Sequence, residues 1–417
     1  MTVQTPLDTT RRPPPRHILL TSDSGQFGGM EMRMIDEARA LRDMGHRVTV
    51  AVADFPGRDR MADRLRDLDV PLEHYEPARV LSDYNHRFRA RWQAATRPET
   101  GLGRFAPDLV HVFFSWTDQG IDHLWAAGRA GLPAVASIRN SFTPWPLTRW
   151  HRLHLPTAFR SVRALYGVSG AALDSFAATF DSWIPNTARR TVIHNGVDTD
   201  RFVPSPTQRL RARKALGIPG HVPLVGSVGR LADQKRPLEL LEVFRRVRRR
   251  LPEARLLLVG SGHLEAQVRE EITRTGLTEA VVILPFTHAV EALYCAMDLH
   301  LLISRNEGFS SVIAEAMACG VPVVGTRVPG TEEVIRGTKA GALVPFGDPA
   351  AIARTVIDIL ESGADARARM GQAGREAAVM RFSRDAWLAR ITRFYAEVLN
   401  PAAPSAAVAA APRGKRA

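Results

Sequence analysis

The sequence predicts an α/β fold with two doubly wound, Rossmann-like domains that face each other across a central cleft. The chain has 417 residues, which is more than one ordinary hydrophobic core accommodates. Short apolar runs alternate with amphipathic stretches, and this alternation favours parallel sheets covered by helices on both faces. A polar stretch at 194–208 with two prolines separates two such series, so it is the predicted domain boundary.

The first series predicts an N-terminal domain over residues 17–200. A helix over 29–44 is expected to follow its first strand, and helical stretches separate most of the later strands. The strands are predicted at 17–21, 47–53, 108–114, 133–138 and 164–169.

The second series predicts a C-terminal domain over 201–382. Asp348 followed by Pro349 is a typical helix start, because aspartate caps a helix and proline fits its first position. We expect a terminal helix over 383–400 to pack back on the first domain, and 1–16 and 401–417 to be disordered tails. The strands of this domain are predicted at 222–229, 255–260, 281–285, 299–304, 322–326 and 341–345.

Composition indicates a soluble globular protein, with 45% hydrophobic and 24% charged residues. No apolar run reaches the roughly 18–20 residues that span a bilayer, and the N-terminus lacks the apolar core of a signal peptide. Two cysteines, Cys295 and Cys319, cannot form a disulfide framework, so we expect a cytoplasmic protein. The net charge of +13 favours anionic partners without choosing among nucleic acid, acidic lipid and phosphorylated substrate.

The stretch NEGFSSVIAEAMACGVPVV (306–324) is the most informative part of the sequence. It predicts a short helix that begins at Ser310 or Ser311 and ends at Gly320. Free N–H groups at the start of such a helix can bind a phosphate. Glu307 precedes this helix and Glu315 lies one turn inside it.

Glu315 does not complete a capping box, because neither serine stands three residues before it. Its neighbours on the helix are apolar, so we expect a buried or half-buried carboxylate with a partner, although an exposed stripe is the alternative. In the stretch 226–235, Arg230 and Lys235 follow a predicted strand and suit a diphosphate, although a solvated charge pair remains the other interpretation. Lys235 is notable because the chain has only four lysines.

These motifs resemble glycosyltransferase family 4. The resemblance is carried by SRNEGFSSVIAEAMACGVPVVGTRVPGTEEVI (304–335), VGSVGRLADQK (225–235) and VIHNGVDTDRF (192–202), and it extends more loosely over 17–400. It implies the GT-B fold and retaining transfer of a hexose-type sugar from a nucleotide diphosphate sugar, with UDP as the default by frequency. The implied acceptor is a hydroxyl of a glycan, a lipid-linked glycan or a natural product.

The resemblance also implies roles for individual residues. Arg230 and Lys235 would neutralise the leaving diphosphate, Glu307 would hold hydroxyls of the donor sugar, and Glu315 would hold the ribose. Backbone N–H groups of the turn would contact sugar and phosphate, at Gly308, Phe309, Ser310 and Ser311. The base would be read by backbone around Leu284, Pro285 and Phe286, although many relatives have glycine near Pro285.

In the first domain, the turn at Gly28 and Gly29 resembles the family's approach to the donor phosphate, although a glycine pair alone is an ordinary turn. Many relatives carry a cleft-facing histidine where this sequence has Arg139 and Asn140. Arg139 is therefore a candidate for contacts to the sugar or acceptor, or else the donor differs. We expect His111 to be a core histidine.

Two further motifs and one enzymatic alternative bear on the predicted function. Asp-x-Asp at 198–200 is interpreted as a structural turn, so no metal and no cofactor is expected besides the co-substrate. Gly-Ser-Gly at 260–262 lacks the dinucleotide fingerprint, because position 265 is glutamate. A nucleotide-sugar epimerase or a sugar phosphorylase of the same fold is the nearest enzymatic alternative.

The non-enzymatic alternative is a basic nucleic-acid-binding protein, motivated by RRVRRR at 245–250, although arginines at a helix end are usually solvated and no nucleic acid is expected. The stretches 84–93 and 142–165 mix arginine with aromatic residues and leucine. They fit either a peripheral contact with an anionic membrane or the border of an acceptor groove.

Overall fold

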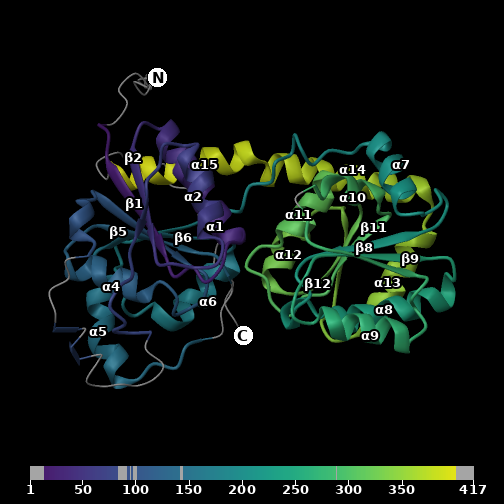
Figure 1. Cartoon of the computed structure of the whole chain (residues 1–417), viewed down its shortest axis with the longest axis horizontal. Coiled ribbons are helices and arrows are strands. Elements are labelled where there is room, and N and C mark those ends of the chain that lie inside the picture. The colour runs from purple at the N-terminus through teal and green to yellow at the C-terminus, as the bar shows by residue number, and fades with distance from the viewer. Residues whose placement is uncertain are drawn as a thin grey trace, which may run out of the picture.

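The computed structural model describes residues 14–82, 92–93, 95–96, 101–140, 144–287 and 289–400. Two α/β domains lie side by side, each with a parallel sheet between layers of helices (Figure 1). The fold class predicted from the sequence is confirmed. Most of the predicted tails, at 1–13 and 401–417, lies outside the described residues, as do 84–91 and 142–143 of the two arginine-rich stretches.

The first domain contains a seven-stranded sheet in the order β3-β2-β1-β4-β5-β6-β7, and all neighbours are parallel. The order reverses between β1 and β4, so this edge is the switch point where ligands bind in such sheets. The strands are β1 (His17–Ser22), β2 (Arg47–Val52), β3 (Leu72–His74), β4 (Leu109–Phe114), β5 (Ala134–Ile138), β6 (Val162–Gly167) and β7 (Arg189–Val192).

Helices cover both faces of this sheet. The central strands β1, β4 and β5 are buried along their whole length, which explains their continuous apolar runs. The helices are α1 (Gly29–Asp43), α2 (Arg58–Arg66), α4 (Ile121–Arg129), α5 (Arg149–Phe159) and α6 (Gly170–Phe180), with a 3-10 turn η1 (Gly103–Phe105).

The second domain contains a six-stranded parallel sheet in the order β10-β9-β8-β11-β12-β13. Its strands are β8 (Leu224–Val228), β9 (Arg255–Val259), β10 (Val281–Leu284), β11 (Leu299–Leu302), β12 (Val323–Thr326) and β13 (Gly341–Val344). Its helical elements are α7 (Pro206–Ala215), η2 (Asp233–Lys235), α8 (Pro237–Arg250), α9 (Glu265–Arg274), α10 (Glu291–Ala296), α11 (Ser311–Ala318), α12 (Pro329–Ile335), α13 (Pro349–Glu361) and α14 (Ala364–Phe382).

The chain crosses between the domains at two places that are bonded to each other. The first crossing follows β7, and the second is the junction of α14 with α15 (Arg384–Leu399). The Val197 N–H donates to the carbonyl of Phe382 at 2.7 Å, and the Arg384 N–H donates to the carbonyl of Val197 at 2.8 Å. The helix α7 begins at Pro206, inside the predicted linker, because the Ser205 side chain caps it.

Helix α15 packs on the first domain. Figure 1 shows it in yellow, beside α1 and over the first sheet. It buries apolar and aromatic side chains in a core shared with α1 and the first sheet, namely Trp387, Ile391, Phe394, Tyr395 and Val398.

Candidate active site

The segment from Glu307 to the start of α11, called the glutamate turn, lies at the carboxyl end of β11, beside the loop that follows β8. This arrangement brings Lys235 onto Glu307, with the ammonium paired to the carboxylate. The Ser304 hydroxyl donates to Glu307 Oε1 at 2.6 Å, and Glu307 is only 6% exposed. Two residues predicted separately from the sequence therefore form one ion pair, in which Glu307 is buried and Lys235 is half-buried.

The charge of Lys235 also acts on the strand beneath it. Burial, together with this charge, lowers the pKa of His300 on β11 to about 3. The imidazole is therefore neutral at physiological pH, and its Nε2 lies 3.3 Å from the backbone nitrogen of Val228. The positive charge of the site thus comes from Lys235 and not from this histidine.

Arg230 is exposed on the same loop and is held less tightly. Its guanidinium donates to the Gln234 side chain at 3.4 Å. Gln234 in turn donates to the carbonyl of Asn306 at 2.7 Å. It therefore connects the loop that carries Arg230 and Lys235, called the cation loop, to the glutamate turn. Arg230 is therefore placed at the rim of the turn, whereas Lys235 lies inside it.

The Gly-Ser-Gly stretch after β9 supports this cation loop. A Cβ added at Gly260 would collide with the carbonyl of Gly229, and one added at Gly262 would collide with that of Leu231. The glycines are thus required for close packing against the loop that carries Arg230. This packing accounts for the motif without a dinucleotide.

The start of α11 has no side-chain cap within the described structure. Ser310 occupies the cap position, but its hydroxyl bonds that of Thr331 at 2.7 Å. The Ser311 N–H already donates to the Phe309 carbonyl at 2.9 Å and the Ser310 N–H to that of Gly330 at 3.4 Å, so an anion there would compete with these bonds, whereas the helix dipole favours negative charge. The turn of Gly308, Phe309 and Ser311 lies at this helix start, as predicted.

Glu315 is half-buried, as expected, and the Tyr294 hydroxyl donates to its Oε2 at 2.9 Å. Burial raises the pKa of the Glu315 carboxyl, although Tyr294 and the charges of Arg33 and Arg201 act in the opposite direction. Arg33 belongs to α1 of the first domain. The charges that lower the pKa of Glu315 therefore come from both domains.

The Gly28–Gly29 turn forms the start of α1. The Gly28 N–H donates to Glu31 Oε2 at 2.8 Å, and burial raises the pKa of this glutamate. A Cβ added at Gly29 would meet nothing within 4 Å, so space lies open beside the turn.

The two domains meet closely at Gly308. A Cβ there would collide with the carbonyl of Arg139 and with the Cα of Asn140. Only glycine therefore allows the glutamate turn to approach the loop after β5. The backbone of Arg139 thus reaches the glutamate turn.

The side chain of Arg139 does not reach the glutamate turn. It is only 7% exposed, it is ion-paired with Glu37, and it donates to the Tyr166 hydroxyl at 2.7 Å. The guanidinium also lies over the ring of Phe113, 4.8 Å from its centroid. The geometry therefore corrects the expectation that this arginine takes over side-chain contacts to sugar or acceptor, because a buried glutamate holds it in the interior.

Glu37 is the centre of a buried network that the sequence analysis missed. The hydroxyl of Tyr166 donates to Glu37 Oε1, and that of Tyr395 donates to Oε2 at 3.1 Å. His111 Nδ1 lies 2.6 Å from the Tyr395 hydroxyl, and burial with the charge of Arg139 lowers its pKa well below the usual value. A signal was present, because Glu37 lies among the apolar positions of α1.

The predicted base-reading residues lie at the same edge of the second sheet. Leu284 ends β10, and Pro285 and Phe286 follow it. Phe286 is 67% exposed, and its N–H donates to the Ser261 hydroxyl at 3.4 Å. This loop therefore borders the cation loop through the Gly-Ser-Gly stretch.

A second charged cluster, also unpredicted, follows β1 in the first domain. Asp23 pairs with Arg79 at 2.7 Å, accepts from the Gly120 N–H at 2.7 Å and lies 3.3 Å from His123 Nε2. Burial alone would raise the pKa of Asp23, but the His123 and Arg79 interactions outweigh it and hold this pKa well below its usual range. The cluster lies at the switch point of the first sheet.

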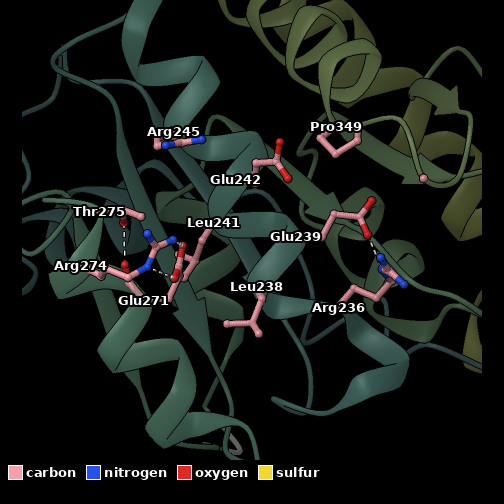
Figure 2. Close-up of a pocket in the computed structure, with 11 residues that line it drawn as sticks. Arg236, Leu238, Glu239, Leu241, Glu242, Arg245, Glu271, Arg274, Thr275 and Pro349 are labelled. Carbon is pink, nitrogen blue, oxygen red and sulfur yellow. Dashed lines mark hydrogen bonds and ion pairs between the residues drawn. The ribbon is translucent and has the colours of Figure 1, made fainter.

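A cavity of about 410 Å³ lies on α8 and α9, outside this site (Figure 2). None of the predicted site residues lines it. Its charges are largely compensated, because Arg236 pairs with Glu239 and Arg274 with Glu271. The arginine run at the end of α8 is similarly engaged, since Arg246 and Arg250 pair with glutamates.

Membrane-spanning helices and clusters of metal ligands are both absent from the described ranges. No helix there is both long and apolar enough to cross a membrane. No group of three or more His, Cys, Asp or Glu side chains in the same ranges is arranged to hold a metal ion.

Two Rossmann-like domains, each with a parallel sheet between layers of helices, form the GT-B fold, which glycosyltransferases such as HepE and WaaG share. Residues 27–201 match the family model described as Glycosyltransferase Family 4, and 208–377 match Glycosyl transferases group 1. The chain therefore belongs to glycosyltransferase family 4, as its motifs predicted.

Known relatives support the assignment. A GDP-mannose-dependent alpha-mannosyltransferase of Mycobacterium tuberculosis is 28% identical over 330 residues, 78% of this chain and 82% of that protein. A GDP-mannose-dependent alpha-(1-6)-phosphatidylinositol monomannoside mannosyltransferase of Mycolicibacterium smegmatis is 36% identical over 264 residues, 60% of this chain and 66% of that protein. The fold is similar to that of Anabaena HepE in complex with UDP and glucose, with a TM-score of 0.72 and 23% identity over 93% of this chain and 100% of that chain.

Proposed function

We propose that this glycosyltransferase is a retaining hexosyltransferase that uses a nucleoside diphosphate sugar. The observation that carries the proposal is the ion pair of half-buried Lys235 with buried Glu307 beside the start of α11, which has no side-chain cap. Lys235, Arg230 and the helix start would stabilise the charge that the leaving diphosphate gains. Glu307 would accept hydrogen bonds from the sugar hydroxyls, and Glu315 from the ribose.

Retention is proposed from the resemblance to the family. No residue proposed for the site is a convincing nucleophile, which is consistent with a front-face step and not with a covalent intermediate. In the proposed front-face step, the acceptor hydroxyl oxygen bonds the anomeric carbon while the bond to the diphosphate breaks. The hydroxyl proton passes to the departing diphosphate oxygen. Closure of the domains would exclude water and protect the donor from hydrolysis.

The nucleotide is the first point to measure. UDP is the choice by family frequency, whereas two relatives are named for GDP-mannose and HepE was crystallised with UDP. We expect thermal unfolding with UDP, GDP, ADP and TDP in turn to show a higher midpoint with one nucleotide. A ligand at about a hundred times its dissociation constant stabilises by about 2.7 kcal/mol.

The same experiment tests the expectation that no metal is required. The shift should be equal in magnesium and in EDTA, and it should be smaller in Lys235→Ala but unchanged in Lys339→Ala, which removes an exposed lysine. A folded sample that responds to none of the four nucleotides would contradict the donor site. A product released without an acceptor would favour the epimerase or phosphorylase alternative.

We further propose that the first domain contacts an anionic membrane surface through α5. Leu153 on this helix is 65% exposed, and Arg149 and Arg152 are exposed beside it. Helix α5 lies at the outer end of the first domain, away from the second (Figure 1). One relative is named for a phosphatidylinositol acceptor, which is consistent with a lipid substrate.

Co-sedimentation with phosphatidylcholine vesicles, with and without phosphatidylserine, tests this contact. We expect binding only with the anionic lipid, and weaker binding for Leu153→Asp and for Arg152→Glu, since each basic residue near such a surface contributes about 1 kcal/mol. Leu210→Asp is the matched control, because Leu210 is 69% exposed on α7 of the second domain. Equal binding of all variants would contradict the contact and favour a soluble acceptor.

A further inference from the structure

A carboxylate of the second domain caps a helix of the first. Glu333 on α12 accepts from the Gly170 N–H through both oxygens, at 2.8 and 3.1 Å. Gly170 is the first residue of α6, whose own cap, Ser169, accepts only from the Ala172 N–H at 3.1 Å. The start of α6 therefore has one cap from its own domain and one from the other. The negative charge is favourable there because it lies at the positive end of the helix dipole.

The same carboxylate contacts the segment that joins the domains. His194 Nε2 lies 2.6 Å from Glu333 Oε1. The His194 ring stacks on Phe309 with centroids 5.6 Å apart and meets the edge of Phe382 at 5.4 Å. Phe309 belongs to the glutamate turn. Glu333 therefore connects α6 with the first crossing, through His194, and with the glutamate turn, through the contact of His194 with Phe309.

The backbone of Glu333 is fixed as well. Arg381, near the end of α14, donates to its carbonyl oxygen at 2.9 Å. The side chain is 26% exposed, so water would replace its hydrogen bonds if the domains separated. The bonds to Gly170 exist only while the domains are together. Their free energy therefore contributes to the balance between separated and closed domains.

We propose that Glu333 is a positioning residue that holds the two domains closed. In this arrangement Gly308 meets the backbone of Arg139 and Asn140, which brings the glutamate turn against the first domain. The effect on transfer rests on the proposed function, whereas the effect on domain separation does not. Glu333 is expected to act through this arrangement and to make no contact with the reacting atoms.

Glu333→Gln is the direct test, because it removes the charge and keeps the shape. Spin labels at exposed Glu73 of the first domain and Arg249 of the second report the distance between domains without any substrate. We expect the ratio of closed to open molecules to fall roughly tenfold, which is about 1.4 kcal/mol, since a charged hydrogen bond and a helix dipole are both weakened. In addition, the KM for the donor should rise while the melting temperature stays nearly constant.

Glu332→Gln is the matched control. Glu332 is the adjacent glutamate, and it pairs with Arg327 at 3.3 Å and with Arg336, both within the second domain. It should leave the distance distribution unchanged. His194→Phe is a second variant that keeps the ring beside Phe309 while removing the bond to Glu333, so it should shift the distance in the same direction.

A distance distribution that is the same in Glu333→Gln, His194→Phe and the control would overturn the proposal. If the distances shift but no donor binds to any variant, the positioning role stands and the proposed transferase function fails. If Glu333→Gln does not fold, the His194→Phe distances decide the question alone.

Discussion

Replacing Lys235 with alanine is expected to lower kcat by roughly 100-fold or more. The reason is that Lys235 is the half-buried cation paired with Glu307 at the glutamate turn, and preorganised charge at a leaving group is typically worth two to three orders of magnitude in rate. The measurement is the steady-state rate with a saturating donor. Lys235→Arg should retain part of the activity, because it keeps the charge but not the shape of the ammonium.

The control must separate charge loss from disruption of the turn. Lys235→Ala leaves the carboxylate of Glu307 with the Ser304 hydroxyl and without its ion partner. Lys235→Ala combined with Glu307→Gln removes this uncompensated charge, so its unfolding midpoint should recover while activity does not. Full activity in Lys235→Ala would mean that the phosphate assignment is wrong.

Replacing Glu37 with alanine is expected to reduce the free energy of unfolding by about 3–5 kcal/mol. Breaking a buried ion pair leaves the other charge uncompensated, and here Arg139 would remain in the interior of the first domain. The hydroxyls of Tyr166 and Tyr395 would lose their acceptor as well. Urea unfolding, monitored on the first domain, measures this change.

A double variant distinguishes a pair from two independent contributions. Glu37→Leu with Arg139→Met replaces both charges by apolar side chains of similar length, which is often nearly neutral for a buried pair. We therefore expect only the part of the loss that comes from the uncompensated Arg139 charge to return, because the hydroxyls of Tyr166 and Tyr395 still lack Glu37. A loss below about 1 kcal/mol for Glu37→Ala would contradict the assignment of a buried, essential pair.

The strands that the sequence predicted carry apolar runs. Most of them are buried, whereas β10 and β13, the edge strands of the second sheet, are partly exposed but keep the apolar sequences VVIL and GALV. Strand β4, for example, is apolar except for His111 and buried throughout, so its run was visible in the sequence. Strands β3 and β7 were missed. They lie at the two edges of the first sheet, and their residues LEH and RRTV are partly exposed, so burial imposed no apolar run on them.

The site shows the same division between local and distant information. Glu307 and Lys235 belong to motifs that are continuous in sequence, so they could be predicted. The direction of Arg139 depends on Glu37, 102 residues earlier on another element, and no spacing rule reports such a pairing. The contact of Glu333 with Gly170 joins residues 163 apart in different domains, so it too was invisible before folding.

The paired crossings determine how the domains can move. A single connecting strand would allow one domain to twist about its own backbone as well as to swing. Here two crossings run side by side and are joined by hydrogen bonds at Val197, and Gly196 packs against Trp387 so closely that a Cβ would not fit. Twisting about either strand would break these bonds, whereas bending across both would keep them. Opening and closing should therefore follow one dominant rotation about an axis through both crossings. The glutamate turn should then return to the loop after β5 in each cycle.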